Sequence, residues 1–404
     1  MRVDIRPGTA RGIVAAPPSK SLTHRMLLCA GLADGTSTVR NVAFSEDVLA
    51  TLDVLRAIGA KTEIRGDTVT VTGCDVRKTS YPGVISCRES GSTLRFCIPL
   101  LMLSGRPFLL TGEGRLMDRP QTEYEALFSE QGLIFRREGD RLRLQGPLSP
   151  GEYTLRGDVS SQFFSGLLFA LLLLRGDSRI TILPPVESRS YIDLTVDVLQ
   201  RFGVETRWES ETSLLIPGGQ SYRRQDVTVE GDWSNAAFFE ALAAMGDGVI
   251  VTGLDKHSKQ GDRVCREYFA RLREGLQTLD VSDCPDLAPV LMAVGAAFHG
   301  VILTGTRRLA LKESDRGAAM EEELEKLGVH CTLEENRIVV RPGIRTPQTP
   351  LEGHNDHRIV MAGAVLLTRV GGRIRGAEAV NKSFPDFFDR LRGLGIEVTE
   401  SCSS

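Results

Sequence analysis

The chain of 404 residues has no CxxC pair and no regular cysteine framework, although it contains eight cysteines. Cys29, Cys97 and Cys265 lie inside amphipathic patterns, where free buried thiols are expected in a reducing compartment. A scaffold built on disulfides is therefore not expected.

Long apolar runs and charge blocks of one sign are also missing. The longest apolar stretch, Leu167–Leu174, is too short to span a bilayer and ends at Arg175. The opening MRVDIRPGTARG lacks an apolar signal core and an Arg/Ser-rich transit character. The net charge is −3 and no Lys/Arg block dominates one region, which argues against nucleic acid and membrane surfaces as partners. We expect a soluble cytoplasmic protein with no nucleic-acid or membrane partner.

The length of the chain exceeds what one hydrophobic core usually supports, so two domains are expected. A boundary is predicted near Gln225–Val229, after the Gly218-Gly219 turn. The first domain would cover residues 19–228, and the second would combine residues 1–18 with 229–404. The opening strand, Arg2–Ile5, is expected to pair within the second domain.

An internal repeat organises the sequence into six similar units. Each unit begins with a polar cap and an Ala/Leu/Phe-rich helix, followed by a glycine turn, a β-branched strand and a second amphipathic helix. A glycine ends each second helix, because glycine adopts the left-handed conformation found there. These glycines are Gly59, Gly132, Gly203, Gly275, Gly328 and Gly395, of which Gly275 has the least regular surroundings.

The six first helices open with similar polar residues. Ser, Asn and Asp are typical N-caps, so capping explains part of the pattern. Capping alone does not explain the Lys, Arg, Gln and His beside these caps. Helices in equivalent positions of a repeat should point the same way, so we expect their positive ends to gather at anion-binding surfaces. The openings are Ser19-Lys20-Ser21, Ser90-Gly91-Ser92-Thr93, Ser160-Ser161-Gln162, Ser234-Asn235, Pro285-Asp286 and Asn355-Asp356-His357.

The first opening carries the most specific anion-binding pattern. Lys20 adds a full positive charge to the helix start, and Arg25 lies one turn beyond Ser21 on the same helical face. A hydroxyl and a guanidinium can then bind one ligand. The alternative is an ordinary capped surface helix with solvated basic residues.

Five further clusters carry charge. Arg95 lies one turn into the helix that opens at Gly91, and the loop 111–120 contains Arg115 and Arg119. Lys312 and Arg316 either clamp one anion or pair with Glu313 and Asp315 in a solvated run. His354-Asn355-Asp356-His357-Arg358 first suggests a metal site, but Arg358 would repel a cation, so an anion site or a helix cap is favoured. The last cluster is Asn381-Lys382-Ser383, before another helix.

Asp286 is the acidic exception among the helix starts. It is either a plain N-cap or, among lysines and arginines, a group that takes a proton from a substrate hydroxyl. Neighbouring positive charge would lower its pKa and keep it ionised. Glu313 is the second candidate for proton transfer.

Ten stretches resemble the EPSP synthase (3-phosphoshikimate 1-carboxyvinyltransferase) branch of the enolpyruvate transferase family. The resemblance spans the whole chain, in the family's order. It implies an α/β fold, a two-domain inside-out α/β barrel with three βαβαββ units per domain and the active site in the interdomain cleft. The stretches are PPSKSLTHR, SGSTLR, GEGRLMDRP, GDVSSQF, ESRSYID, VEGDWSNAAFF, PDLAP, LKESDR, NDHR and NKSFPDFF.

The resemblance also implies a reaction and its residues. The enolpyruvyl group of phosphoenolpyruvate would pass to the 5-hydroxyl of shikimate 3-phosphate, with no metal and no cofactor, in a monomer. Asp286 would be the base, and Glu313 and Lys382 would be candidates for protonating the methylene carbon. Shikimate 3-phosphate would contact Lys20, Ser21, Arg25, Ser160, Ser161, Gln162, Ser188, Tyr191, Asp286 and Lys312. Phosphoenolpyruvate would contact Lys20, Gly91, Arg115, Gln162, Arg316, Arg358 and Lys382.

This chain departs from the family's pattern at two places. Glu89 and Ser90 stand where the family often has Asn and a small residue, and an acid there can weaken phosphoenolpyruvate binding or change the response to glyphosate. Arg308 stands where some members place an Asn that contacts shikimate 3-phosphate.

Two alternatives stay open at this point. The sister enzyme that acts on UDP-N-acetylglucosamine usually carries a reactive cysteine in the arginine loop, and residues 111–120 contain none. A non-catalytic binder of phosphorylated metabolites would not require Asp286 and Glu313 beside its cations.

Overall fold

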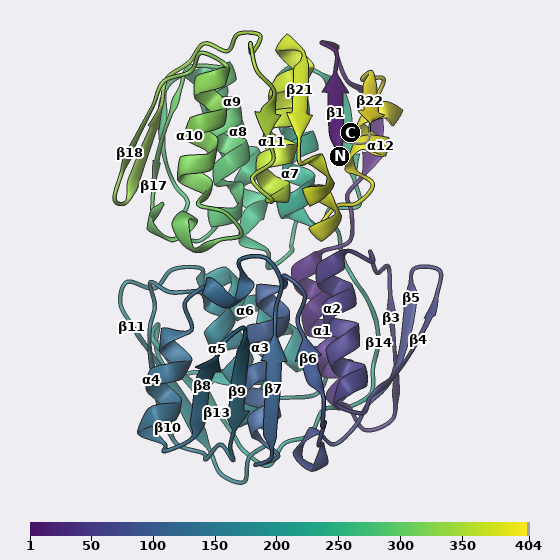
Figure 1. The fold of residues 1–404 in the computed structure, drawn as a ribbon, viewed down its shortest axis with the longest axis vertical. Helices are drawn as coiled ribbons and strands as arrows, with labels where there is room; N and C mark the ends of the chain where they lie inside the picture. Colours follow the sequence, from purple (N-terminus) through teal and green to yellow (C-terminus); the bar gives the residue numbers. More distant parts are fainter. Residues whose placement is uncertain (402–404) are drawn as a thin grey trace. The chain divides into compact units, whose positions relative to one another are not determined.

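The computed structural model describes residues 1–401 as a mixed α/β fold with two compact units (Figure 1). We call Lys20–Glu230 the continuous unit, and Met1–Ser19 with the chain from Gly231 onward the two-segment unit. Each unit has its own apolar core. One core includes Leu22 and Val229, and the other includes Val3 and Val398.

The continuous unit contains three four-stranded sheets with one topology. Their strand orders are β14-β3-β5-β4, β6-β7-β9-β8 and β10-β11-β13-β12. In each sheet the first two strands are parallel and the remaining neighbours are antiparallel. The strands are β3 (Thr36–Arg40), β4 (Lys61–Arg65), β5 (Thr68–Thr72), β6 (Val84–Ser86), β7 (Pro107–Thr111), β8 (Ile134–Glu138), β9 (Arg141–Gln145), β10 (Glu152–Arg156), β11 (Ser178–Leu183), β12 (Arg207–Trp208), β13 (Ser213–Ile216) and β14 (Asp226–Thr228).

The two-segment unit repeats this topology twice. Its sheets have the orders β16-β17-β19-β18 and β20-β21-β1-β22, and β15 pairs with β2 in a two-stranded sheet. These βαβ-containing sheets make the internal repeat visible in three dimensions. The strands are β1 (Arg2–Ile5), β2 (Arg11–Ala15), β15 (Gly248–Thr252), β16 (Gln277–Asp280), β17 (Val301–Thr304), β18 (Cys331–Glu334), β19 (Arg337–Val340), β20 (Leu351–Glu352), β21 (Gly372–Arg375) and β22 (Val398–Ser401).

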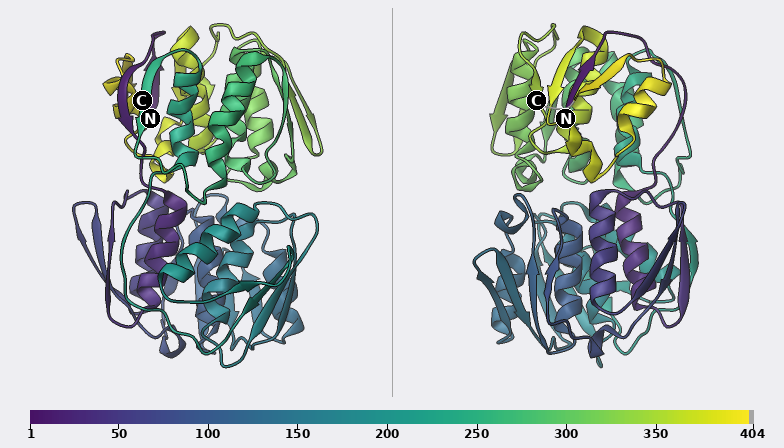
Figure 2. Two further views of the ribbon diagram at one scale, coloured as in Figure 1. Left: turned by 180° about the vertical axis from the view of Figure 1, so that it is seen from behind. Right: turned by 45° about the vertical axis from the view of Figure 1, so that its right-hand side comes forward.

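Two strands join sheets far from their own place in the sequence. β1 lies between β21 and β22, so Val3 faces Ile374 and Glu400, as predicted for the opening strand. Figures 1 and 2 show this purple strand beside the yellow end of the chain. β14 likewise pairs with β3 in parallel, with Val227 opposite Val39. Each of these sheets is therefore completed by a strand that is distant in the sequence.

The first helix of each repeat is buried on nearly all sides. In α5, for example, Phe163–Leu171 is completely buried. A helix that is apolar all round must lie inside a core, whereas the second helices are amphipathic and lie nearer the surface. The first helices are α1 (Lys20–Leu32), α3 (Gly91–Met102), α5 (Ser161–Leu171), α7 (Trp233–Ala244), α9 (Ala288–Ala297) and α11 (His357–Val370). The second helices are α2 (Glu46–Ala57), α4 (Thr122–Glu130), α6 (Arg189–Arg201), α8 (Cys265–Glu274), α10 (Arg316–Lys326) and α12 (Phe387–Gly393).

The helix starts confirm three of the six predicted caps. Ser90, Ser160 and Asp356 accept backbone N–H groups at the starts of α3, α5 and α11. The predicted cap at Ser234 is wrong, because Asp232 caps α7. Of the two roles considered for Asp286, the plain N-cap is not observed. Asp286 lies inside the 3₁₀ turn Pro285–Leu287 before α9, and the N-cap positions of that turn and of α9 are Cys284 and Leu287.

The free cysteines behave as predicted, since Cys29, Cys97 and Cys265 are buried thiols. Within residues 1–401, no helix combines the length and the apolarity that crossing a membrane requires.

Candidate active site

Asp286 lies among three cations in the two-segment unit. Its carboxylate accepts hydrogen bonds from Lys312 Nζ at 3.1 Å, Arg316 Nη1 at 2.7 Å and Arg358 Nη2 at 3.0 Å. These groups come from the 3₁₀ turn before α9, the segment before α10, the first residue of α10 and the first turn of α11. Burial raises the pKa of Asp286, but the charges of Arg358, Lys312 and Arg316 outweigh it and hold that pKa well below the usual value. Asp286 is therefore ionised.

Arg316 is the centre of this cluster and is only 1% exposed. It contacts three carboxylates: Asp286, Glu313 Oε2 at 2.8 Å and Asp356 Oδ2 at 2.8 Å. Burial lowers the pKa of Arg316, but the three carboxylates have the larger, opposite effect. The net pKa is raised, and the guanidinium stays charged. Of the two alternatives for this segment, the solvated charge run does not describe Arg316, because tertiary packing brings carboxylates from three elements onto one buried cation.

Asp356 fixes the geometry of this cluster. Its fully buried carboxylate accepts one hydrogen bond from Arg316 Nε and another, at 2.9 Å, from the backbone N–H of Arg358 at the start of α11. Ser314 Oγ donates to the same carboxylate at 3.1 Å. One side chain thus holds Arg316 against the helix that carries Arg358.

Lys312 and Lys382 border the cluster. Burial lowers the pKa of Lys312, and the contact with Asp286 partly offsets this effect. Lys382 Nζ donates to the carbonyl of Asn355 at 2.7 Å, one residue before Asp356. The residues predicted for proton transfer, Asp286, Glu313 and Lys382, thus all belong to one neighbourhood of the two-segment unit.

The continuous unit carries the second group of predicted residues. Lys20, the first residue of α1, pairs with Asp47 of α2 at 2.9 Å. Arg25 is 2% exposed and donates to Thr195 Oγ1 at 2.8 Å, to Ser165 Oγ at 3.3 Å and to the carbonyls of Ser21 and Tyr191. Burial lowers the pKa of Arg25 to about 10, so it remains charged at neutral pH.

The partners of Arg25 are all neutral hydrogen-bond acceptors. Among residues 1–401, no carboxylate pairs with its guanidinium, which leaves a buried positive charge without a counter-ion. An uncompensated buried cation is costly, and an anionic ligand near the start of α1 would offset it. Arg25 also fixes the backbones of Ser21 and Tyr191, two residues expected to contact shikimate 3-phosphate.

Gln162 joins the starts of α5 and α3. Its Oε1 accepts Arg95 Nη1 at 2.9 Å, and its Nε2 donates to Ser92 Oγ at 2.9 Å. Arg95 in turn donates to the carbonyl of Pro120 at 2.9 Å. Of the remaining predicted residues, Ser160 and Ser161 lie at the start of α5, and Ser188 lies in the left-handed conformation before α6, with φ 53°.

The arginine beside Gly91 is Arg119, which the sequence reasoning did not assign to the site. A Cβ atom on Gly91 would lie 2.6 Å from Arg119 Nη1, so the absence of a side chain lets this guanidinium lie against the helix start. Arg115, the predicted residue, is exposed. Both arginines belong to the same sequence motif, so the motif alone does not show which of them lies beside Gly91. The backbone path of the loop determines this.

Glu89 faces the same loop. Its Oε1 lies 1.8 Å from the position that a Cβ on Gly114 would occupy, and Gly114 has a φ of +54°. A residue other than glycine at 114 would meet Glu89 directly. The acid that departs from the family's pattern thus packs on the turn that leads to the arginines.

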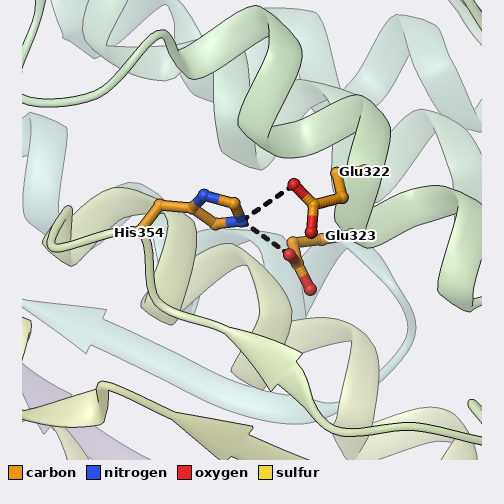
Figure 3. A group of neighbouring side chains, drawn as sticks. All are labelled: Glu322, Glu323 and His354. Carbon is orange, nitrogen blue, oxygen red and sulfur yellow. Dashed lines mark hydrogen bonds and ion pairs between the residues drawn. The ribbon is translucent and has the colours of Figure 1, made fainter.

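His354 lies beside Glu322 and Glu323 of α10 (Figure 3). Its Nε2 is 2.6 Å from Glu323 Oε1 and 3.9 Å from Glu322 Oε2. Within residues 1–401 this is the group whose histidine and carboxylate atoms lie close enough to share an ion. However, Lys326 Nζ contacts Glu323 at 2.8 Å and Glu322 at 3.2 Å and already supplies positive charge. The sequence reasoning missed these partners because α10 brings them from thirty residues away.

Comparison with known proteins decides the family. The EPSP synthase (3-phosphoshikimate 1-carboxyvinyltransferase) family model matches residues 6–391. The chain belongs to the EPSP synthase family. It is 40% identical over 420 residues to the 3-phosphoshikimate 1-carboxyvinyltransferase of Clostridium kluyveri, covering 98% of each chain. A Clostridium perfringens protein of the same name is 37% identical over 417 residues, with 98% of each chain covered.

Solved structures agree on the fold. EPSP synthase from Acinetobacter baumannii matches with a TM-score of 0.79 and 24% identity, covering 99% of this chain and 100% of that chain. The enolpyruvyl transferase NikO from Streptomyces tendae matches with a TM-score of 0.74 and 15% identity, covering 98% of each chain. Family membership makes this chain a transferase with EPSP synthase activity, in the shikimate route to aromatic amino acids. It also decides against the two alternatives that the sequence left open.

Proposed function

We propose that this chain transfers the enolpyruvyl group of phosphoenolpyruvate to the 5-hydroxyl of shikimate 3-phosphate and releases phosphate. The observation that carries the proposal is the Asp286 carboxylate within hydrogen-bond distance of Lys312, Arg316 and Arg358. A base surrounded by cations suits a reaction in which a hydroxyl loses its proton beside two phosphorylated, carboxylated substrates.

Shikimate 3-phosphate is held mainly by the continuous unit in this proposal. Lys20 and the start of α1 supply positive charge, and Arg25 adds the buried charge that has no carboxylate counterpart. Because the hydrogen bonds of Arg25 go to protein atoms, its role is to add charge and to fix Ser21 and Tyr191. The other proposed contacts are Ser160, Ser161, Gln162, Ser188, Asp286 and Lys312.

Phosphoenolpyruvate is held by Arg316, Arg358 and Lys382, and by Lys20, Gln162 and Gly91. We assign the loop arginine to Arg119 in place of Arg115, because Arg119 lies against Gly91 and Arg115 is exposed. Guanidinium groups bind phosphate and carboxylate through paired, charge-assisted hydrogen bonds. Fixed cations of this kind stabilise the charge that builds up on the departing phosphate.

The cations that bind phosphoenolpyruvate are also those that hold down the pKa of Asp286. When substrate anions bind Arg316 and Arg358, their negative charge offsets the positive charge that acts on Asp286. The pKa of this carboxyl then rises. A carboxylate that is too weak a base without substrate becomes a better base when the substrate is bound. Substrate binding thus prepares proton removal.

The reaction then proceeds in two balanced steps. In the addition step, the 5-hydroxyl oxygen bonds to C2 of phosphoenolpyruvate, the hydroxyl proton passes to Asp286, and C3 gains a proton from Glu313 or Lys382. In the elimination step, the C2–O bond to phosphate breaks, the new methyl group loses a proton to the same acid–base group, and phosphate leaves with the proton that Asp286 took up. The family's tetrahedral adduct lies between these steps.

The family's architecture is proposed with the reaction. An inside-out α/β barrel of three βαβαββ units in each domain, with domains 19–228 and 1–18 plus 229–404, agrees with two separate cores and a recurring strand order. The monomeric state stays a prediction.

The deciding experiment is a phosphate-release assay. Purified protein with shikimate 3-phosphate and phosphoenolpyruvate should release phosphate, and UDP-N-acetylglucosamine in place of shikimate 3-phosphate should give none. Release with the nucleotide sugar alone would overturn the proposed acceptor. The absence of release with either acceptor would overturn the proposed reaction.

A further inference from the structure

Four completely buried side chains connect α1, α2 and α3 of the continuous unit. His24 Nδ1 lies 2.7 Å from Thr51 Oγ1, which lies 2.7 Å from Thr93 Oγ1, which lies 2.8 Å from Ser90 Oγ. All four residues are 0% exposed. The chain of hydrogen bonds begins in the helix of Lys20 and Arg25 and ends at the N-cap of the helix that opens with Gly91.

The first link belongs to a pair of parallel contacts between α1 and α2. Lys20 pairs with Asp47, and one turn further along both helices His24 contacts Thr51. Residues four apart lie on one face of a helix, so the two helices run in the same direction along this contact. The position of α2 against α1 is therefore fixed by an ion pair and a hydrogen bond in register.

The hydrogen bonds of this chain run in one direction, from His24 to Ser90. Burial lowers the pKa of His24 well below its usual value, and Lys20 and Arg25 lower it further, so the ring is neutral and carries one N–H. Among residues 1–401, no group forms a hydrogen bond with His24 Nε2. A buried N–H without an acceptor is rarer than a buried lone pair without a donor, so the hydrogen belongs on Nδ1. His24 then donates to Thr51, Thr51 to Thr93, and Thr93 to Ser90.

Ser90 receives the end of this chain and also caps α3. Its Oγ accepts the Thr93 hydroxyl and, at 3.2 Å, the Thr93 backbone N–H. On the other side of Gly91, Ser92 Oγ accepts Gln162 Nε2. The segment Ser90–Ser92 is thus held from both sides, by buried hydroxyls and by an amide of α5.

We infer that His24, Thr51 and Thr93 are positioning residues that hold the Ser90–Ser92 segment, and with it the contact between Gly91 and Arg119, in the geometry that binds phosphoenolpyruvate. The inference rests on the proposed function for the identity of the ligand. It also explains why a serine at position 90 is accommodated where the family often has a small residue, since its hydroxyl completes a hydrogen-bond chain that starts in α1.

The test uses two substitutions of one residue, the middle link. Thr51→Val keeps the shape of the side chain and removes the hydroxyl, whereas Thr51→Ser keeps the hydroxyl and removes a methyl group. Loss of a buried hydrogen bond in a positioning chain should raise the KM for phosphoenolpyruvate about tenfold in Thr51→Val, with kcat and the KM for shikimate 3-phosphate little changed. Thr51→Ser should restore the KM.

If Thr51 served only in packing, Thr51→Ser would raise the KM for phosphoenolpyruvate more than Thr51→Val, because Thr51→Ser leaves a cavity and Thr51→Val does not. Equal KM values for phosphoenolpyruvate in wild type and Thr51→Val, or a larger loss in Thr51→Ser, would overturn the inference. The matched control is Thr368→Val in α11, another buried threonine, whose hydroxyl bonds only the carbonyl of Val365 among the residues that the structure describes. It should leave both KM values unchanged.

A second measurement needs no substrate. Nitrogen-15 spectra of histidine-labelled wild-type protein distinguish a protonated from a bare ring nitrogen, and the spectrum of His24→Asn assigns the signals. A neutral ring with hydrogen on Nδ1 is expected, and a proton on Nε2 would overturn the direction of the chain. If wild type releases no phosphate, the proposed function fails, while this spectrum still decides the hydrogen-bond chain.

Discussion

Asp286 and Arg316 form a hydrogen-bonded ion pair of 2.7 Å, in which the arginine is 1% exposed and the aspartate side chain 19% exposed. The arginine is also held by Glu313 and Asp356, so removing one carboxylate leaves two. The aspartate is similarly held by Lys312 and Arg358. In the proposed mechanism, a base and a substrate-binding cation thus neutralise each other until an anionic substrate arrives.

Asp286→Asn should abolish most turnover while shikimate 3-phosphate still binds. The amide cannot accept the hydroxyl proton, and general base catalysis typically contributes roughly 10²–10⁴-fold. Phosphate release measures turnover, and calorimetry with shikimate 3-phosphate measures binding. Turnover near that of wild type would exclude Asp286 as the base.

Arg119→Ala should weaken phosphoenolpyruvate much more than Arg115→Ala. Loss of a guanidinium next to Gly91 removes charge-assisted hydrogen bonds, so the KM for phosphoenolpyruvate should rise by at least about tenfold. The exposed Arg115 serves as the comparison from the same loop. A larger effect at Arg115 would return the assignment to that residue.

Gly91→Ala should raise the KM for phosphoenolpyruvate without lowering the melting temperature. The added Cβ would meet the flexible end of Arg119, which can move away, and alanine favours a helix more than glycine does. Steady-state kinetics with a thermal melt tests both parts. An unchanged KM would show that the Arg119 guanidinium can shift without affecting the substrate.

His354→Gln should remove a pH-dependent part of the stability. The hydrogen bond to Glu323 raises the pKa of His354 above 6.5, although burial works against it. A group whose pKa is higher in the folded than in the unfolded state stabilises the fold at pH values below its unfolded-state pKa. This stabilisation is lost as the pH rises through the folded-state pKa. The free energy of unfolding should therefore be higher in wild type than in His354→Gln. This difference should be largest at about pH 6 and smallest at about pH 8.

Urea titrations at several pH values measure this difference. The exposed His299, substituted by glutamine, is the control, and its difference from wild type should not follow the same trend. A His354→Gln difference that is constant with pH would contradict the ion pair between His354 and Glu323.

The local signals in the sequence were sufficient for three of the six helix starts. Ser90, Ser160 and Asp356 cap their helices because a short polar side chain before an apolar run binds the free N–H groups of the first turn. At Ser234 and Asp286 the same reasoning failed, since Asp232 and Pro285 begin those helical segments earlier. Propensity identifies that a helix starts nearby but does not fix the residue.

Capping, periodicity and motifs are local, so the family, the repeated pattern of elements and the residue types at the site could be predicted from the sequence. Contacts between distant segments became visible only in three dimensions. The tertiary structure showed which loop arginine lies against Gly91, that β1 and β14 complete distant sheets, and that Arg316 pairs with three carboxylates. These contacts depend on packing between segments far apart in the chain, and spacing along the sequence carries no information about which buried partners will meet.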